Sequence, residues 1–404
     1  MTSKSLAVQQ IVIAGAGYAG LHVALRLAAR LDRQDGSAVR LVDHHDYHQV
    51  LTELPRVAAG TRAATDVRLP LPDILESRVD FTLAQVAGFD LPGRQILTDR
   101  GALPYTRLVL ALGSRPNDFA IPGLAERAVS LYSVDDAERV RFLVTATLRA
   151  AAAESDPERQ RCLATVVVGG GGATGVELAG ELADTLPELA GRFGLPARLP
   201  RVILVEAGPT ILAGSSPGLI QRASRILAEL KVAVRTNTRI VEATRDGFRL
   251  KNGEVIEGGV FVWAGGVKAP QLVVDSGLPT GHNGRIKVDQ YLRVLDHPEI
   301  FVAGDLASVV DPATGHVLPP LAQIALDEAE TVAGNLVAEL AGEPLEPYQF
   351  RYKGSVVSVG PENAVADVLG HVFGGRLAHV LKDAIEWEYR QSVRHLRGWS
   401  VLAA

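Results

Sequence analysis

The stretch Ile11-Val-Ile-Ala-Gly15-Ala-Gly17-Tyr-Ala-Gly20-Leu-His-Val-Ala24 decides the fold of this chain. A β-branched, apolar run leads directly into Gly-x-Gly-x-x-Gly, and an alanine- and leucine-rich helical pattern follows. In such a turn Gly15 allows the tight bend, Gly17 lets the backbone approach a pyrophosphate, and Gly20 lets the helix pack on the strand. The N-terminus of the helix also attracts phosphates. The stretch therefore predicts a dinucleotide site.

An acid stands where the ribose of such a dinucleotide would lie. The next predicted strand, residues 39–42, ends in Asp43, which follows Gly20 by 23 residues. A carboxylate at this distance accepts hydrogen bonds from a ribose 2′-hydroxyl. The loop after it contains His44, His45 and His48. A metal site would need further ligands elsewhere, so we interpret this loop as polar chain beside a cofactor ring and predict no metal.

The opening motif recurs in the middle of the chain. The stretch Thr165-Val-Val-Val-Gly-Gly170-Gly-Gly172-Ala-Thr-Gly175 again joins a strand to a helix, and the following strand, residues 202–205, ends in Glu206. An acid at that position favours NADH over NADPH, whose 2′-phosphate it would repel. The first glycines of the two motifs are 155 residues apart, which predicts two dinucleotides. An internal duplication with one inactive site is the alternative.

Two later turns are suited to close approach by a ligand. The strand at 260–263 runs into Ala264-Gly265-Gly266, and the strand at 299–303 runs into Gly304-Asp305. The apolar run at 105–112 likewise ends in Gly113, as a buried parallel strand meeting a ligand would. We expect these turns to complete the two dinucleotide sites.

The composition excludes several classes of protein. A length of 404 residues is enough for two or three domains. The single cysteine, Cys162, excludes a disulfide framework, a Cys-x-x-Cys redox pair and a cysteine-ligated cluster. A net charge of −5 gives no reason to expect a nucleic-acid partner. No signal-peptide pattern and no apolar run of about 18 residues occur, so we expect a cytoplasmic protein.

The C-terminal tail predicts an amphipathic helix over residues 375–397. Its apolar positions recur at helical spacing: Leu377, Leu381, Ile385, Tyr389, Val393 and Leu396. Its end carries Arg390, Arg394, Arg397 and Trp399. Such a helix can lie in a membrane interface, or it can pack on the body of the protein or on a second copy.

These features together resemble one family of flavoproteins, the type II NADH:quinone oxidoreductases. The resemblance covers residues 9 to about 330. Besides the two glycine motifs and the two later turns, it rests on Asp46-Tyr-His48, Ala111-Leu-Gly-Ser114, Gly172-Ala-Thr-Gly-Val-Glu-Leu-Ala-Gly-Glu181 and Pro319-Pro-Leu-Ala-Gln323-Ile-Ala325.

The resemblance implies an α/β fold with two Rossmann-like dinucleotide-binding domains and a small C-terminal α+β segment. Residues 1–125 and 286–345 would form the FAD-binding domain, residues 126–285 the NAD(H)-binding domain, and residues 346–404 a C-terminal region. The activity implied is that of an NADH dehydrogenase that passes a hydride from NADH to FAD and two electrons to a quinone, without pumping protons.

The resemblance also implies site residues. Non-covalent FAD would contact Gly15, Gly17, Tyr18, Ala19, Gly20, Asp43, His44, His48, Ala111, Gly113, Gly304, Asp305 and Ala322. NADH would contact Gly170, Gly172, Ala173, Thr174, Gly175, Glu206, Ala264, Gly265 and Gly266. The catalytic residues would be Glu177, Gln323 and Lys268, and the quinone would contact Gln323 and Asp327.

Two departures from the family pattern bear on the acceptor and on the membrane. Asp327 stands where the family has a glutamine, which could change or abolish quinone use. The tail is more polar than a usual anchor, with Lys382, Asp383, Glu386 and Glu388 along it. Peripheral contact with the inner face of the cell membrane and a homodimer are expectations from the family. The alternatives are a reductase of a ferredoxin- or rubredoxin-type carrier, and an NADH sensor that resembles apoptosis-inducing factor.

Overall fold

The first glycine motif lies at the centre of a six-stranded sheet. The structure, a computed structural model, describes residues 9–31, 37–75, 77–245, 247–312 and 314–395. The strand order is β21-β22-β9-β1-β2-β5, and all neighbours pair in parallel except β21 with β22. The strands are β1 (Gln9–Ala14), β2 (Ser37–Asp43), β5 (Val79–Leu83), β9 (Arg107–Leu110), β21 (Arg293–Val294) and β22 (His297–Val302).

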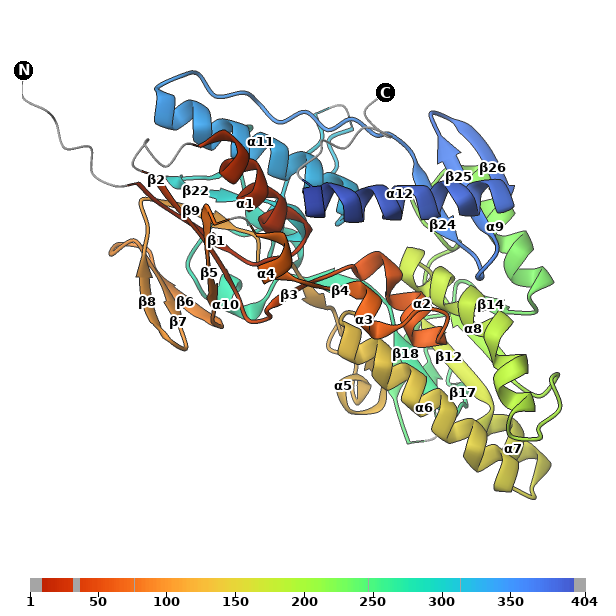
Figure 1. The fold of residues 1–404 in the computed structure, drawn as a ribbon. Coiled ribbons are helices and arrows are strands. Elements are labelled where there is room, and N and C mark those ends of the chain that lie inside the picture. Colours follow the sequence, from red (N-terminus) through yellow and green to blue (C-terminus); the bar gives the residue numbers. More distant parts are fainter. Residues whose placement is uncertain (1–8, 32–36, 76, 246, 313, 396–404) are drawn as a thin grey trace, which may run out of the picture.

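Both faces of this sheet are covered, which explains the unbroken apolar run of β1. Ile11 to Ala14 are all buried. On one face α1 (Tyr18–Arg30) and α11 (Ala322–Ala341) pack against each other (Figure 1). The side chains of Val12 and Ala14 belong to a second apolar cluster. That cluster includes residues of a small antiparallel sheet, β6 (Val86–Asp90), β7 (Gln95–Thr98) and β8 (Gly101–Pro104).

The second glycine motif lies in a five-stranded parallel sheet of order β11-β18-β12-β13-β14. Its strands are β11 (Val129–Ser130), β12 (Thr165–Gly169), β13 (Arg201–Val205), β14 (Ala233–Arg235) and β18 (Val260–Trp263). Its helices are α6 (Val134–Ala153), α8 (Ala173–Gly191) and α9 (Pro217–Glu229), and α2 (Leu54–Ala59) packs on α6 and α8. A small sheet, β15 (Ile240–Ala243), β16 (Phe248–Leu250) and β17 (Val255–Ile256), shares an apolar cluster with Val167 and Trp263.

Two helices precede the second glycine motif. Ser133 caps α6, since its hydroxyl accepts a hydrogen bond from Asp136 N while the Asp136 carboxylate accepts one from Ser133 N. The helix α6 ends at Ala153, and Asp156 then caps a second helix, α7 (Pro157–Leu163). An Asp-Pro pair is a strong helix start, so the sequence held the signal for this break.

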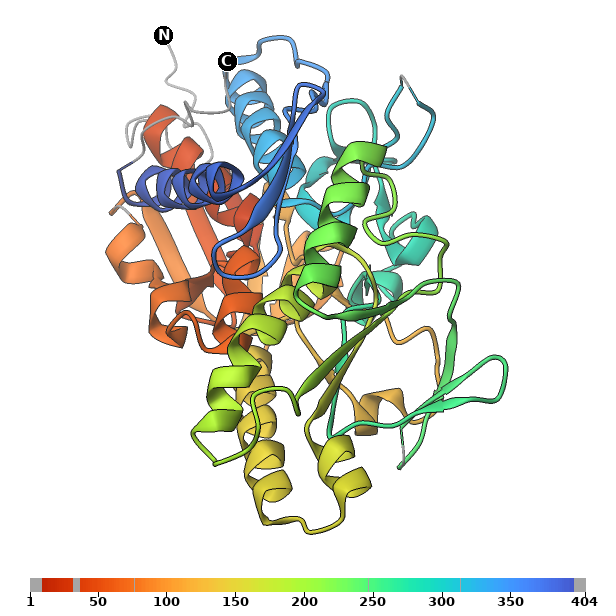
Figure 2. The ribbon, with the colours of Figure 1, turned by 90° about the vertical axis from the view of Figure 1, so that its right-hand side faces the viewer.

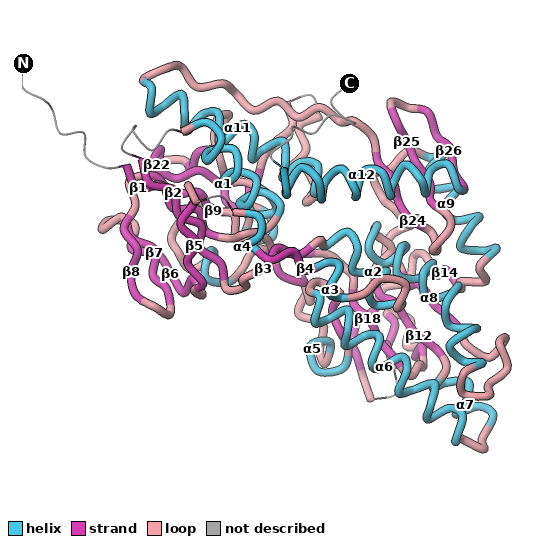
Figure 3. The backbone as a smooth tube through the Cα atoms, viewed as in Figure 1, coloured by secondary structure: helices cyan, strands magenta, loops and turns pink. Residues whose placement is uncertain are grey.

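The C-terminal part of the described chain forms a third layer that contacts the elements around both large sheets. A loop over residues 342–354 leads from α11 to the antiparallel strands β24 (Ser355–Ser358), β25 (Ala364–Val368) and β26 (His371–Gly375), as Figure 3 shows. The helix α12 (Arg376–His395) packs on these strands, and in Figure 2 it lies beside the red N-terminal elements. Residues 396 and 397 of the expected helix, with Trp399, lie outside the described residues.

Short elements complete the described chain: β3 (Tyr47–Gln49), α3 (Ala64–Val67), β4 (Arg68–Pro70), α4 (Leu71–Ile74), β10 (Arg115–Pro116), α5 (Leu124–Arg127), β19 (Val267–Lys268), α10 (Gln271–Val274), β20 (Ile286–Lys287) and β23 (Ala307–Ser308). Strands β10 and β19 pair antiparallel where the chain passes between the two large sheets. Within the described ranges, no helix is long and apolar enough to cross a bilayer.

Candidate active site

The first glycine turn, residues 15–20, forms a cradle. Gly15 and Gly20 pack closely against backbone, whereas Gly17 is open to solvent. Gly15 has a φ of +106°, and a Cβ on it would lie 2.2 Å from the carbonyl oxygen of Ala111. A Cβ on Gly20 would lie 1.9 Å from the carbonyl oxygen of Gly15, so both positions require glycine. A Cβ on Gly17 would have no atom within 4 Å. The backbone of Gly17 is therefore accessible, as a pyrophosphate site requires.

The second turn repeats this geometry. Gly170 has a φ of +112°, and a Cβ there would lie 2.3 Å from the carbonyl oxygen of Ala264. A Cβ on Gly175 would lie 1.9 Å from the carbonyl oxygen of Gly170, whereas one on Gly172 would have no atom within 4 Å. Ala173 and Thr174 begin α8 and are exposed beside Gly172. The chain thus contains two cradles of the same construction, and both fit a dinucleotide.

In each cradle a backbone N–H group donates a hydrogen bond to the acid at the end of the neighbouring strand. Asp43 accepts hydrogen bonds from Ala16 N at 2.6 Å and from His45 N at 2.8 Å. Glu206 accepts from Gly171 N at 2.7 Å and from Gly208 N at 2.6 Å. Each carboxylate therefore lies beside the turn that it was predicted to serve.

Asp43 is held in its charged form. Burial acts to raise the pKa of Asp43, but hydrogen bonds from His44, Ala16 N and His45 N outweigh it and lower the pKa. The His44 ring lies against that of His45, with 3.9 Å between ring centroids and the two planes tilted by 40°. His48 is separate from this pair and fully buried beneath the first turn, where its Nδ1 lies 2.9 Å from the carbonyl oxygen of Ala16. The described residues contain no group of three potential metal ligands.

The remaining predicted FAD contacts meet at the ends of β9 and β22. These strands are parallel neighbours, so Ala111 and Gly113 after β9 lie near Gly304 and Asp305 after β22. Gly304 has a φ of +77°, and a Cβ on it would lie 3.2 Å from the Cβ of Ala19. Such strand ends are the usual ligand edge of an open α/β sheet.

The side chain of Asp305 is half-buried at this edge. It accepts a hydrogen bond from Ser114 Oγ at 2.7 Å, and burial raises the pKa of Asp305 against the effect of that bond. Tyr18, at the start of α1, places its hydroxyl 3.3 Å from Thr52 Oγ1. These contacts place the predicted polar groups around the first turn.

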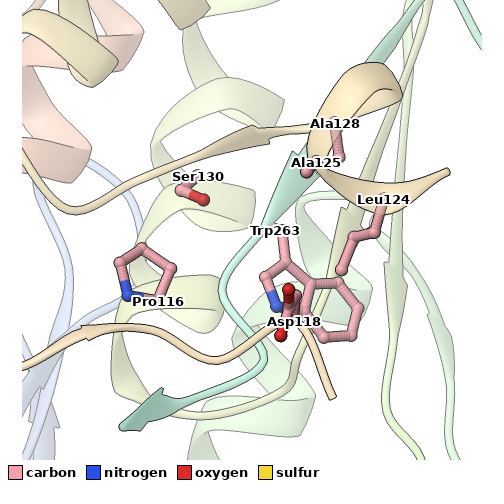
Figure 4. A pocket seen from close by; sticks show the side chains of 7 residues that line it. All are labelled: Pro116, Asp118, Leu124, Ala125, Ala128, Ser130 and Trp263. Atoms are coloured by element: carbon pink, nitrogen blue, oxygen red, sulfur yellow. The ribbon is translucent and has the colours of Figure 1, made fainter. Parts of the chain in front are cut away.

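Trp263 anchors the turn that follows β18. Its Nε1 donates to the carbonyl oxygen of Asn117 at 2.8 Å, and Ala264, Gly265 and Gly266 follow beside the second cradle. A cavity of about 220 Å³ lies next to the indole, and Figure 4 shows the side chains that line it. Lys268 forms a half-exposed ion pair with Asp118 at 2.8 Å, where the chain crosses between the two sheets. The charge of Lys268 is therefore already balanced by a carboxylate. A catalytic role for Lys268 stays a prediction.

Glu177 is paired with a lysine that sequence reasoning missed. Its carboxylate is buried, accepts a hydrogen bond from Ser358 N at 3.0 Å, and forms an ion pair with Lys382 of α12. Burial acts to lower the pKa of Lys382, but the carboxylates of Glu177 and Glu386 outweigh it and raise the pKa. Lys382 is therefore a buried cation beside the second cradle.

The buried face of α12 differs from the expected one. Leu377 is 70% exposed, whereas Lys382 and Glu386 are buried on the same face as Ala378, Tyr389 and Val393. Two of the four charged residues noted along the tail, Lys382 and Glu386, therefore lie inside the protein, and Leu377, one of the expected apolar positions, lies outside. Positions 378, 382, 386, 389 and 393 follow helical spacing, but two of them are charged, so the apolar pattern of the sequence did not indicate this face.

The buried charges of α12 continue into a cluster with α2. Arg56 lies between Glu386, Glu53, Glu181 and Asp383, at N–O distances of 3.0–3.8 Å. Burial and a hydrogen bond with Glu53 raise the pKa of Glu386 to about 9. Glu177 and Lys382 form a compensated pair beside this cluster.

The predicted quinone residues begin α11. Gln323 is half-buried next to Ala322, and its Nε2 has no hydrogen-bond partner among the described residues. A buried donor without a partner is costly unless a ligand or water accepts from it. Asp327 forms an ion pair with Lys353 at 3.7 Å, and burial raises the pKa of Asp327 against the effect of Lys353. The sequence also did not single out Lys353 as a site residue, because it lies in the loop before β24, outside the motifs of the family.

Two open cradles, each with an acid at the neighbouring strand, define an oxidoreductase that binds two dinucleotides. The family model of the pyridine nucleotide-disulphide oxidoreductases matches residues 9–329. The chain is 31% identical over 382 residues to a type II NADH:quinone oxidoreductase of Staphylococcus epidermidis and 30% identical to that of Staphylococcus aureus, with 94% of each chain covered.

Solved structures share the fold. NDH2 of Plasmodium falciparum in complex with NADH aligns with a TM-score of 0.85 at 18% identity over 96% of each chain. The sulfide:quinone oxidoreductase of Aquifex aeolicus aligns with a TM-score of 0.78 at 18% identity, covering 96% of this chain and 91% of that one. The chain belongs to the type II NADH:quinone oxidoreductase family. The fold class and the family expected from the sequence are confirmed.

Proposed function

We propose that this protein is an FAD-dependent NADH dehydrogenase that reduces a quinone. The observation that carries this function is the pair of open glycine cradles, at Gly15–Gly20 and Gly170–Gly175, in a chain that relatives of this activity match over 94% of its length. Bound FAD supplies the hydride acceptor for NADH and the source of two electrons for the quinone.

The first cradle is our candidate for FAD and the second for NADH. Gly17 offers an open backbone to the FAD pyrophosphate, and Asp43 offers a carboxylate to the ribose. Gly172 and Glu206 offer the same two features to NADH. The charge of Glu206 would repel a 2′-phosphate, which supports NADH over NADPH.

The expected domain boundaries follow the same division. The first sheet takes its strands from residues 9–110 and 293–302, and the second from residues 129–263. This distribution supports an FAD-binding domain of residues 1–125 and 286–345, an NAD(H)-binding domain of residues 126–285, and a C-terminal region from residue 346.

The chain's own residues would bind the quinone and move its protons. Gln323 Nε2 is a donor suited to a quinone carbonyl oxygen. Reduction of a quinone to a quinol by two electrons consumes two protons, and the buried pair of Glu177 and Lys382 is our candidate for moving one of them. Lys353 balances the charge of Asp327, so a quinone carbonyl there would not face an uncompensated carboxylate.

Replacing Gln323 by leucine should slow quinone reduction about 10-fold, because one hydrogen bond to the acceptor is lost. The half-reactions are separated by mixing the yellow protein with NADH without oxygen, then adding a short-chain quinone, while flavin absorbance is followed. Bleaching by NADH should keep its wild-type rate. The control is Gln221→Leu, an exposed glutamine on α9.

Two outcomes would contradict this reading. Equal slowing of both half-reactions would show that Gln323 does not serve the quinone alone. Fast bleaching of the wild type with slow reoxidation by every quinone would remove the quinone from the proposal and favour a small electron-carrier protein as acceptor.

The outer face of α12 is our candidate for peripheral membrane contact. Leu377, Val380 and Trp387 are 70%, 62% and 64% exposed, which is a large apolar surface for one helix. Trp387→Asp should abolish co-sedimentation with anionic lipid vesicles, while the FAD content stays unchanged. The wild-type protein could instead fail to bind vesicles and show a molecular mass that rises with protein concentration. If Trp387→Asp abolished that rise in mass, this face would be assigned to a homodimer.

A further inference from the structure

A buried chain of hydrogen bonds links the C-terminal helix to the first glycine turn. The hydroxyl of Tyr389, on α12, lies 2.7 Å from His48 Nε2, and His48 Nδ1 lies 2.9 Å from the carbonyl oxygen of Ala16. Tyr389 is 4% exposed and His48 is fully buried. Ala16 stands between Gly15 and Gly17 in the cradle itself.

The chemistry of these groups fixes the direction of both hydrogen bonds. Burial lowers the pKa of His48 to about 4, so the ring is neutral and carries a single proton. The carbonyl of Ala16 can only accept, which places that proton on Nδ1 and leaves Nε2 as an acceptor. The hydroxyl of Tyr389 must then donate to Nε2, and burial, which raises the pKa of Tyr389, keeps that hydroxyl protonated.

The hydrogen bond to Ala16 orients the group that would meet a phosphate. The carbonyl of Ala16 and the N–H of Gly17 belong to one planar trans peptide, so they point in opposite directions. Holding the carbonyl toward His48 turns the N–H of Gly17 toward the open side of the cradle. Asp43 holds the N–H of Ala16 from the other side at 2.6 Å, so the turn is fixed at two points.

The second turn offers an internal comparison. The matching carbonyl there, that of Gly171, accepts a hydrogen bond from Leu212 N at 2.7 Å. The same peptide is therefore held in both cradles. In the second cradle the donor is nearby backbone, whereas in the first it is the ring of His48, whose other nitrogen accepts a hydrogen bond from Tyr389, 341 residues later in the chain.

We propose that Tyr389 is a positioning residue of the FAD site, which acts through His48 to hold the peptide between Ala16 and Gly17 in its ligand-binding orientation. Tyr18 packs on both rings, at 5.2 Å from His48 and 4.8 Å from Tyr389 between ring centroids. The helix α12 thereby becomes part of the first cradle. This inference rests on the proposal that FAD occupies that cradle.

The test is the FAD affinity of Tyr389→Phe, which removes one hydroxyl and keeps the ring. The full-length apoprotein is titrated with FAD and followed by quenching of flavin fluorescence, and NAD⁺ binding to the same apoprotein is measured by calorimetry. We expect the dissociation constant for FAD to rise about 5- to 10-fold, as for loss of one buried hydrogen bond, with NAD⁺ binding unchanged. The matched control is Tyr352→Phe, a half-exposed tyrosine.

A double-mutant cycle keeps the inference falsifiable if His48 variants are weakened generally. His48→Asn should reduce FAD affinity, and adding Tyr389→Phe to it should have little further effect, because the proposed effect of Tyr389 on the FAD site passes through His48. Additive losses, unchanged FAD affinity in Tyr389→Phe, or an equal loss of NAD⁺ affinity would overturn the role of Tyr389. If the wild-type apoprotein binds no FAD, the proposed FAD site fails instead.

Discussion

Replacing Lys382 by methionine should slow the reoxidation of the flavin by quinone about 100-fold. Quinone reduction consumes protons, Lys382 is a buried cation beside the second cradle, and a positioned proton donor typically contributes 10²–10⁴-fold. Bleaching by NADH should change by a much smaller factor, because hydride transfer to FAD takes no proton from this lysine. Stopped-flow measurement of the two half-reactions checks the result.

The same variant should also be less stable, and that effect must be separated from the rate. Methionine leaves the buried Glu177 carboxylate without its cation, which typically costs about 3–5 kcal/mol. Adding Glu177→Gln to Lys382→Met removes the unpaired charge and should restore most of the stability without restoring the rate. If the double variant recovers the rate as well, the pair is structural and Lys382 does not deliver a proton.

Replacing Glu206 by arginine should shift the preference for NADH over NADPH about 100-fold toward NADPH. The carboxylate at the end of β13 is lost, and a cation that can pair with a 2′-phosphate takes its place. Glu206→Gln keeps the shape without the charge and should give about a 10-fold smaller shift. The ratio of kcat/KM for the two nucleotides measures the change.

The FAD content tests the specificity of this effect. Asp43 serves the first cradle, so both Glu206 variants should retain FAD at the wild-type level. Glu254→Gln, which changes an exposed acid in an ion pair with Arg235, is the matched control in the same half of the chain. Unchanged nucleotide preference in Glu206→Arg would remove Glu206 from the NADH site.

The sequence by itself determined the two cradles and the family. Gly15, Gly20, Gly170 and Gly175 are required by local backbone geometry, since any Cβ there would collide with a carbonyl group nearby. Asp43 and Glu206 end the strands next to those turns, so their positions also follow from short-range connectivity. Features that depend on a few neighbouring residues can be predicted from a pattern of glycines and acids.

Only the tertiary structure decided which face of α12 is buried. The apolar spacing of the tail included Leu377 and left out Lys382. In the structure Leu377 is exposed, and Lys382 is buried because Glu177, 205 residues earlier, supplies its counter-charge. Tyr389 was predicted as one apolar position among several, and its hydroxyl gains the proposed role because the fold places His48 against it. Burial of a polar side chain depends on a partner that satisfies it, and here each partner comes from a distant part of the chain that only the fold brings into contact.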